Sequence, residues 1–253
     1  DIHRERLNEK IQFVSTTLQA LLTKKSHVIK GKVARLCRDS AVIYRTAAHV
    51  MLCPVKTRAH IMTLLRIEKN NGIATVSLNR PDKRNAMSFA LLKELVRTAE
   101  KLKKDRSLRC VILTGEAKVF SAGIDLADLN NPQNRAFAAW ELIKPGQSLF
   151  QKAFLVWQQL PVPVIAAIEG YCFGAGMQLA LAADIRIAHP DTQMSIMESR
   201  WGLVPDMGLS RSLKGLIGLD LAKDVTLSAR IFDANYAKEI GLVTHLDATP
   251  LQK

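Results

Sequence analysis

Two glycine-bearing loops hold the residues of this chain best suited to chemistry. They are residues 120–125, with the sequence FSAGID, and residues 170–176, with the sequence GYCFGAG. Each loop follows a short apolar run that predicts a buried strand, and each opens into a segment with helical spacing. The first N–H groups of a helix have no intrahelical acceptor. Two such turns side by side can aim two backbone donors at one developing oxyanion, which is a hypothesis for an active site built from main chain.

The composition predicts an α/β protein around these loops. The chain has 253 residues, of which 48% are hydrophobic, enough for the core of one domain or of one domain with an appendage. Only 6% of the residues are aromatic, so we expect a mainly aliphatic core. Runs of Ile, Val, Leu and Ala bounded by Gly and Pro favour α/β architecture over an all-β sandwich.

Apolar spacing predicts the order of the elements. We expect strands at 64–67 and 73–78, joined as a hairpin by a turn that ends in Asn71-Gly72. Ser88 is the expected N-cap of a helix that runs to about Lys104. Further expected elements are strand–loop–helix units at 110–130 and 162–182, a strand at 184–188, and helices near 208–218, 220–229 and 233–240.

Residues 1–61 differ in charge from the rest of the chain. They hold twelve Lys and Arg residues against four acidic residues, within a chain of net charge +13. Apolar spacing predicts an amphipathic helix at 7–22 and a weaker one at 28–43. We therefore expect a basic helical extension at 1–61 and a separate domain at 62–253. The extension can be independent, can fill space left by a missing segment, or can be a basic targeting or artificially added sequence.

Several classes of function are disfavoured. The longest apolar run, 162–187, is interrupted by Glu169, Gln178 and Asp184, so we expect no membrane span. Basic and aromatic residues are not interleaved, and we expect no nucleic-acid partner. The four cysteines form no CxxC pair and the six histidines show no ligand spacing, so we expect reduced thiols and no metal. The expected compartment is the cytoplasm, with the mitochondrial matrix as the alternative.

Five ordered motifs lie between about Leu64 and Leu246. They are Asn79-Arg80-Pro81 with Asn85-Ala86, FSAGIDL at 120–126, IAAIEG at 165–170, GAG at 174–176 with LAADI at 181–185, and Glu198 with GLVPDMG at 202–208. Together they resemble the crotonase superfamily, the enoyl-CoA hydratase/isomerase group. The resemblance implies a spiral of ββα turns, usually assembled as a homotrimer or a hexamer.

The resemblance also implies the ligand. It is an acyl-coenzyme A thioester, so coenzyme A arrives as part of the substrate and no cofactor is bound permanently. The thioester carbonyl is expected between the backbone N–H groups of Ile124 and Ala175. Alternatively, the glycines of the two loops serve only close packing of helix on strand.

Six further residues are expected to contact the coenzyme A part of the ligand. The resemblance implies that Arg84, with Lys83 beside it, meets phosphate groups. Asp125 can instead cap the helix that follows it. The full expected set is Arg84, Ala86, Ala122, Gly123, Asp125 and Gly174.

The acid–base residues do not match one subfamily. Relatives that hydrate enoyl thioesters resemble one another in two glutamates, and this chain has Gln178 and Glu198 at those positions. Gln178 cannot act as a general base, although its amide can hold a water. Glu198 is the expected principal acid/base if it lies in an apolar cleft, and a surface or salt-bridged glutamate otherwise. Asp206 matches an aspartate of double-bond isomerases, which also have an acid where this chain has Gln178; alternatively it forms a Pro-Asp turn.

The sequence is compatible with three functions to different degrees. The leading hypothesis is an acyl-CoA enzyme of the enoyl-CoA hydratase or double-bond isomerase type. The alternative is a non-catalytic acyl-CoA-binding or interaction module, favoured by Gln178 and by the expected lack of the family's C-terminal helical tail, which covers the site and builds the trimer. A nicotinamide-binding fold built on Gly174 and Gly176 is disfavoured, because the loop is too long and the third glycine is replaced by Leu179.

Overall fold

The computed structural model describes residues 63–252. The predicted helices at 7–22 and 28–43, and with them the expected helical extension, lie outside the described residues. So do Cys37 and Cys53, two of the four cysteines.

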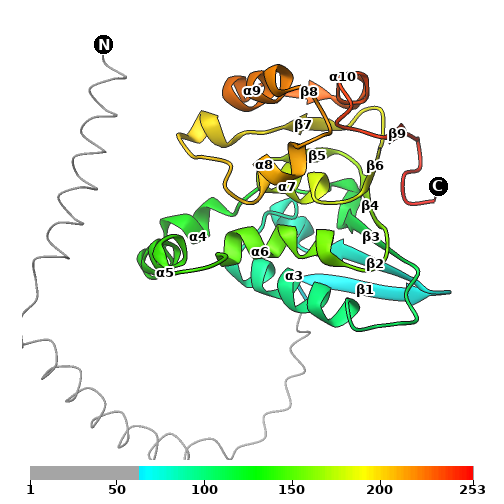
Figure 1. The fold of residues 1–253 in the computed structure, drawn as a ribbon, viewed down its shortest axis with the longest axis horizontal. Coiled ribbons are helices and arrows are strands. Elements are labelled where there is room, and N and C mark those ends of the chain that lie inside the picture. The colour runs from blue at the N-terminus through cyan, green and yellow to red at the C-terminus, as the bar shows by residue number, and fades with distance from the viewer. Residues whose placement is uncertain (1–62, 253) are drawn as a thin grey trace, which may run out of the picture. The chain divides into compact units, whose positions relative to one another are not determined.

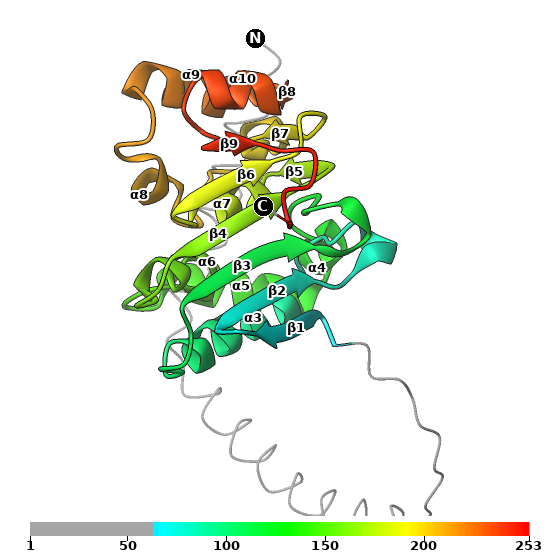
Figure 2. The same cartoon turned by 90° about the vertical axis from the view of Figure 1, so that its right-hand side faces the viewer.

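A six-stranded sheet forms the larger part of the fold. Its strands lie in the order β1 (Leu65–Asn70), β2 (Ile73–Leu78), β3 (Cys110–Gly115), β4 (Val164–Ile168), β6 (Ile185–Ala188) and β9 (His245–Leu246). The pair β1–β2 is antiparallel, and the other neighbours are parallel. Figure 2 shows this sheet facing the viewer, with helices behind it.

A smaller sheet has three strands, and its first strand begins just after β4 ends. Its order is β5 (Tyr171–Phe173), β7 (Gln193–Ser195) and β8 (Phe232–Asp233). Strands β5 and β7 are parallel, whereas β7 and β8 are antiparallel. Strand β5 occupies the middle of the segment 170–176, which was expected to be a loop throughout. It forms because its residues pair with the strand β7 that follows much later in the chain.

The predicted hairpin is present, but its first strand is longer than expected. Asn71 and Gly72 both have positive φ, 48° and 79°, and form a two-residue turn between Asn70 and Ile73. Strand β1 therefore runs to Asn70 rather than ending at Ile67. Its charged residues Glu68 and Lys69 are exposed, as is usual on the edge of a sheet.

Most of the helices lie on one face of the six-stranded sheet (Figures 1 and 2). Helix α3 (Phe89–Leu102) begins as predicted, because the hydroxyl of Ser88 accepts a hydrogen bond from the N–H of Leu91 over 3.2 Å. Two helices that were not expected are α5 (Pro132–Ile143) and α6 (Leu149–Leu155), and α6 packs against α3. The remaining helices are α4 (Leu126–Asn130), α7 (Ala175–Leu181), α8 (Leu209–Leu213), α9 (Leu219–Ser228) and α10 (Ala234–Glu239), with short 3-10 turns η1 (Pro81–Lys83), η2 (Glu116–Lys118), η3 (Trp157–Gln159) and η4 (Glu198–Trp201).

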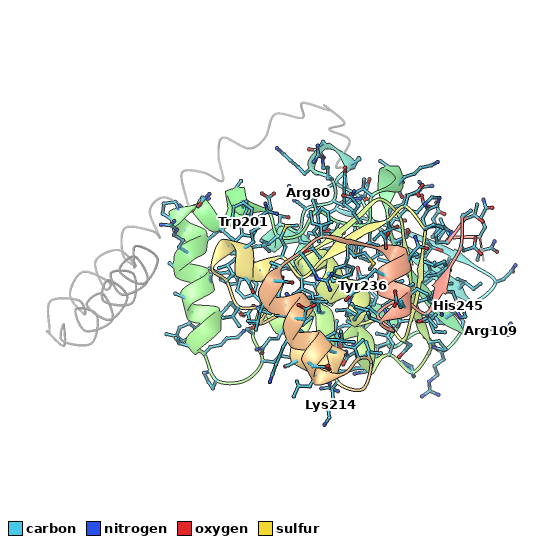
Figure 3. The ribbon with its side chains drawn as sticks, turned by 90° about the horizontal axis from the view of Figure 1, so that it is seen from above. Arg80, Arg109, Trp201, Lys214, Tyr236 and His245 are labelled. Atoms are coloured by element: carbon cyan, nitrogen blue, oxygen red, sulfur yellow. The ribbon has the colours of Figure 1, made fainter. Side chains whose placement is uncertain are left out.

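The core is mainly aliphatic, as the composition predicts. Leu, Ala, Val, Ile and Met side chains make up most of the buried cluster, and Trp157, Phe120 and Phe154 are the largest buried side chains. In the view from above, Trp201 of η4 lies on one side of the molecule and His245 of β9 on the other (Figure 3). The core therefore separates the side of the molecule that carries η4 from the edge strand β9.

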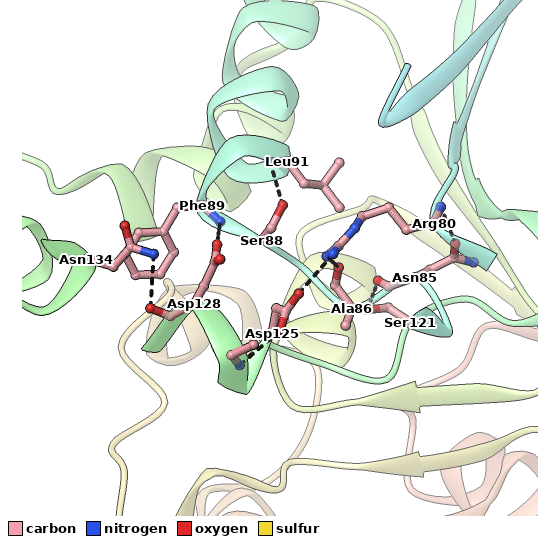
Figure 4. Close-up of polar contacts among 11 residues, drawn as sticks. Arg80, Asn85, Ala86, Ser88, Phe89, Leu91, Ser121, Asp125, Asp128 and Asn134 are labelled. Carbon is pink, nitrogen blue, oxygen red and sulfur yellow. Dashed lines mark hydrogen bonds and ion pairs between the residues drawn. The ribbon is translucent and has the colours of Figure 1, made fainter. Parts of the chain in front are cut away.

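One buried asparagine ties together the loops that lead into the first glycine loop. Asn85 is fully buried and has a φ of 54°. Its side-chain oxygen accepts from the N–H of Arg80 over 2.9 Å, and its amide donates to the carbonyls of Glu116 and Val119 over 2.9 and 2.6 Å. Its own carbonyl accepts from the hydroxyl of Ser121 over 2.9 Å (Figure 4). Asparagine fits because it tolerates positive φ and supplies both donor and acceptor.

Replacing this side chain should destabilise the fold. In Asn85→Ala, three partly buried backbone groups lose their partners, and the free energy of unfolding should fall by about 3 kcal/mol. Urea denaturation followed by circular dichroism measures the change. The control is Asn79→Ala, which removes one exposed hydrogen bond to the carbonyl of Thr63 and should cost less than about 1 kcal/mol. Equal losses in the two variants would contradict the role given to Asn85.

Candidate active site

The two glycine loops lie against each other, as the sequence predicts. The N–H of Phe173 donates to the carbonyl of Ser121 over 3.0 Å, and the N–H of Ser121 donates to that of Tyr171 over 2.8 Å. A methyl group added to Gly174 would lie 4.0 Å from the Cα of Gly123. The two loops are therefore one hydrogen-bonded unit.

The contact between the loops requires glycine. Gly123 and Gly174 have φ values of 103° and 50°, in the region that favours glycine. A methyl group on Gly176 would come within 2.7 Å of the Cβ of Ser121, so the start of α7 can approach the first loop only without a side chain there. These glycines thus allow the two loops to pack closely, and this packing brings Ile124 close to Ala175.

The N–H groups of Ile124 and Ala175 are the expected donors. Ile124 forms an isolated bridge with Met87 that uses the carbonyl of Gly123 and the N–H of Asp125, so the N–H of Ile124 takes no part in it. Ala175 is the first residue of α7, and its N–H therefore has no intrahelical acceptor. A methyl group on Gly123 would lie 3.8 Å from the nitrogen of Ala175. Two backbone donors therefore lie close together.

Both residues line one cavity of about 450 Å³. The cavity brings together eight of the eleven residues expected at the site. These are Ala122, Gly123, Ile124, Gly174, Ala175, Gln178, Glu198 and Asp206. The other lining residues are apolar and come from α4, α5, α6, η4 and the residues on either side of η4.

Glu198 is held in this cavity by Gln178. The amide Nε2 of Gln178 donates to Oε1 of Glu198 over 2.7 Å, and Oε1 of Gln178 accepts from the N–H of Met207 over 3.1 Å. Because Met207 can only donate here, it fixes which end of the Gln178 amide faces Glu198. The other carboxyl oxygen, Oε2 of Glu198, is buried and has no hydrogen-bond partner among the described residues.

The surroundings of Glu198 shift the pKa of its carboxyl upward. Burial raises the pKa of its carboxyl, the hydrogen bond from Gln178 lowers that pKa in part, and the charge of Asp206 raises it further. Burial also raises the pKa of Asp206. The alternative of a surface glutamate is wrong for Glu198, because its side chain is buried. Carboxyls with raised pKa values can both take up and return a proton.

Three expected coenzyme A contacts, Arg84, Ala86 and Asp125, are not among the residues that line the cavity. Arg80 lies between two of them, since its guanidinium pairs with Asp125 over 2.9 Å and donates to the carbonyl of Ala86 (Figure 4). Asp125 also caps α4 by accepting from the N–H of Ala127 over 3.0 Å. The guanidinium of Arg84 lies 5.9 Å from the ring centre of Tyr171. Contact of these residues with coenzyme A stays a prediction.

Sequence reasoning missed residues that shape the site. Arg80 belongs to the Asn79-Arg80-Pro81 motif, but the motif does not reveal its pairing with Asp125. Ala138 and Phe150 come from α5 and α6, the two unexpected helices. Met207 orients Gln178 through its backbone N–H, and a backbone contact of this kind cannot be recognised from the type of residue.

Other kinds of site find no support in the described part of the chain. Residues 63–252 contain no group of three His, Cys, Asp or Glu side chains placed to hold a metal ion. Over the same residues, no helix is both long and apolar enough to cross a membrane. Cys110 and Cys172 are free thiols whose pKa values are raised by burial.

The sequence and the fold match a known family. The sequence model of the enoyl-CoA hydratase/isomerase family matches residues 68–250. The chain therefore belongs to this family, within the crotonase superfamily, and its fold is the crotonase fold.

Two curated mouse relatives show the range of activities in the family. The chain is 36% identical over 193 residues to mitochondrial methylglutaconyl-CoA hydratase, covering 76% of this chain and 60% of that protein. It is 40% identical over 178 residues to mitochondrial Δ(3,5)-Δ(2,4)-dienoyl-CoA isomerase, covering 68% of this chain and 54% of that protein. The chain thus spans between half and three fifths of the length of these relatives.

Solved structures agree with the assignment of the fold. An enoyl-CoA hydratase from Bacillus anthracis aligns with a TM-score of 0.66 and 31% identity over 73% of this chain and 70% of that one. A Thermobifida fusca protein in complex with CoA aligns with a TM-score of 0.65 and 33% identity over 73% of this chain and 72% of that one.

The electrostatics of the cavity predict pKa changes of opposite sign in two variants. Asp206→Asn should lower the pKa of Glu198, because it removes a nearby like charge, and Gln178→Leu should raise it, because it removes a hydrogen bond to the carboxylate. A ¹³C NMR titration of labelled glutamate carboxyls measures both shifts, with Glu198→Gln identifying the signal. Shifts of the same sign in both variants would contradict this account.

Proposed function

We propose that this chain forms the acyl-CoA-binding and catalytic part of an enzyme that stabilises a thioester enolate, of the enoyl-CoA hydratase or double-bond isomerase type. The observation that carries the proposal is one cavity in which the Ile124 and Ala175 N–H groups lie near the carboxyl of Glu198. Preorganised donors of this kind typically contribute about 3–4 kcal/mol each to stabilising an oxyanion.

The proposed binding mode follows from the positions of the loops. The thioester oxygen lies between the two N–H groups, and the backbone at Ala122, Gly123 and Gly174 passes along the ligand. Arg84 contacts a phosphate group of coenzyme A, since it is on the surface and carries a charge suited to phosphate. Ala86 and Asp125 also contact the coenzyme A part of the ligand. No permanently bound cofactor is needed, because coenzyme A enters as part of the substrate.

Proton transfer is assigned to the two carboxyls. The carboxylate of Glu198 removes a proton from carbon next to the thioester carbonyl, and the electron pair moves to the thioester oxygen to form the enolate. Return of a proton to a more distant carbon, from Asp206 or Glu198, moves the double bond. The overall reaction neither gains nor loses atoms. If Glu198 returns the proton, both carboxyls regain their starting states; if a protonated Asp206 donates it instead, a proton must pass from Glu198 to Asp206 before the next turnover.

Asp206 favours isomerisation over hydration, because both kinds of relative have an acid where this chain has Gln178 and only the isomerases match Asp206. Hydration by two carboxyls requires a second acidic group to hold and activate water, and this position is an amide bound to Glu198 and Met207. Asp206 supplies the second carboxyl instead, and it also lines the cavity. Double-bond isomerisation is therefore the better supported of the two reactions.

The assembly and compartment belong to the same proposal. A homotrimer or hexamer is the assembly expected from the family resemblance. Both mouse relatives are mitochondrial by name, and another relative at 37% identity comes from Bacillus subtilis. The cytoplasm and the mitochondrial matrix are thus both compartments in which this chain can act.

Ultraviolet absorbance tests the proposal directly. Purified protein is mixed with crotonyl-CoA or with a 3,5-dienoyl-CoA. Loss of the enone band indicates hydration, whereas a change to the absorbance of a 2,4-dienoyl-CoA indicates isomerisation, the expected result. Binding of coenzyme A without either change would overturn the proposed catalysis and leave an acyl-CoA-binding module.

Glu198→Gln should abolish turnover and preserve binding. The variant keeps the size of the side chain but cannot transfer a proton, so kcat should fall at least about a thousandfold. The affinity for coenzyme A, measured by isothermal titration calorimetry, should be unchanged. The matched control is Glu239→Gln on the exposed face of α10, which should retain full activity. A normal kcat in Glu198→Gln would remove this residue from the mechanism.

A further inference from the structure

The direction of the Ile124 N–H is set by the backbone around it. This N–H belongs to the peptide unit that joins Gly123 to Ile124, and no peptide bond between residues 63 and 252 is cis. In a planar trans peptide unit, the C=O and the N–H point in opposite directions. The carbonyl of Gly123 accepts a hydrogen bond from the N–H of Met87 over 2.8 Å. The N–H of Ile124 therefore points away from Met87, which is fully buried.

The next peptide unit is held by the same residue. The N–H of Asp125 donates to the carbonyl of Met87 over 2.9 Å, so Met87 holds the backbone on both sides of Ile124. This pairing is an isolated bridge and not part of a longer strand ladder. The donor at Ile124 thus keeps its direction only while the segment around Met87 keeps its register along the first glycine loop.

Arg80 joins the two segments on either side of this bridge. Its Nη1 donates to the carbonyl of Ala86, the residue before Met87. Its Nη2 pairs with Oδ2 of Asp125, the residue after Ile124, over 2.9 Å (Figure 4). A guanidinium suits this double contact, because it is planar and its donors are fixed relative to one another.

Each end of the ion pair is held independently of the other. The carboxyl of Asp125 also accepts from the N–H of Ala127 through Oδ1, over 3.0 Å. The N–H of Arg80 donates to the side-chain oxygen of Asn85, and its carbonyl accepts from the N–H of Asn85, both over 2.9 Å. The side chains of Arg80 and Asp125 are only 16% and 15% exposed, so water screens this pair less than a surface pair.

We propose, building on the function above, that Arg80 is a positioning residue for the oxyanion donor at Ile124. By bonding both Ala86 and Asp125, its guanidinium keeps the register of the bridge and with it the direction of the Ile124 N–H. Arg80 is not among the residues that line the cavity, so it acts through the backbone and not by contact with the thioester. Loss of the guanidinium should misdirect one of the two donors and leave Glu198 in place.

Infrared spectroscopy of a bound thioester measures the donor without any need for turnover. Hexanoyl-CoA labelled with ¹³C at the thioester carbon has no double bond to move, and strong hydrogen bonds to its carbonyl oxygen lower the C=O stretching frequency. Binding to the full chain should lower this frequency. In Arg80→Gln the band of the bound ligand should return part of the way toward its position in free hexanoyl-CoA.

Turnover of a 3,5-dienoyl-CoA gives a second readout. The kcat of Arg80→Gln should fall about thirtyfold, because loss of a whole oxyanion donor costs about a hundredfold to a thousandfold and misdirection costs part of that. KM should change by less than about threefold. The matched control is Arg230→Gln, which breaks an exposed pair with Asp224 of the same 2.9 Å length and should leave both readouts unchanged.

Asp125→Asn tests the same contact from its other end. Asparagine keeps the size of the side chain and can still cap α4, but it carries no charge for the guanidinium. This variant should shift the carbonyl band in the same direction as Arg80→Gln. Combining the two substitutions should lower kcat no further than the more severe single change, since both remove one contact. Independent, additive losses would contradict the role given to Arg80.

The outcomes separate this inference from the proposed function. An unchanged carbonyl frequency of bound hexanoyl-CoA in both variants would overturn the inference and leave the proposed function standing. If the unaltered chain does not bind hexanoyl-CoA, or binds it without lowering the frequency, the proposed function and the inference fall together. Should Arg80→Gln fail to fold, the frequency measured in Asp125→Asn decides, because that variant preserves the helix cap.

Discussion

The site depends on the close approach of two backbone segments at Gly123 and Gly174. Neither residue has a Cβ where the segments meet, and hydrogen bonds between Ser121 and the strand β5 hold them in register. Because the donors belong to the main chain, their direction is set by the fold and not by side-chain rotamers. Such a site requires no reorganisation when charge develops on the ligand, and this is what makes backbone donors effective in catalysis.

The rest of the structure supports that contact from outside. Asn85 ties the preceding loops to the first glycine loop, and Arg80 links the helix α4 to the backbone at Ala86. Gln178 then connects the second loop's helix to Glu198 and Met207. The carboxyl of Glu198, the proposed acid/base, is therefore positioned by the same helix whose first N–H, that of Ala175, is a proposed oxyanion donor. Helix α7, a short helix with no exposed residue, thus links the positions of these two groups.

Local signals in the sequence explain what could be predicted. The Asn71-Gly72 turn and the N-cap Ser88 act through neighbouring residues, so the hairpin and α3 follow from the sequence alone. Helices α5 and α6 also carry such signals, an Asn-Pro start at 131–132 and a capping box between Ser148 and Gln151, which could have revealed them. The contact of Gln178 with Met207 could not be predicted, because it joins a side chain to a backbone N–H of a distant loop.

The exposure of Trp201 has a practical consequence. Its indole lines the cavity yet is 59% exposed, whereas Trp157 is fully buried and donates to the carbonyl of Ala153. Indole emission depends strongly on the polarity around the ring, so this residue is a natural fluorophore at the rim of the cavity. Occupancy by a ligand can thus be followed without a label, and the slow and fast steps of entry become separable by stopped-flow spectroscopy.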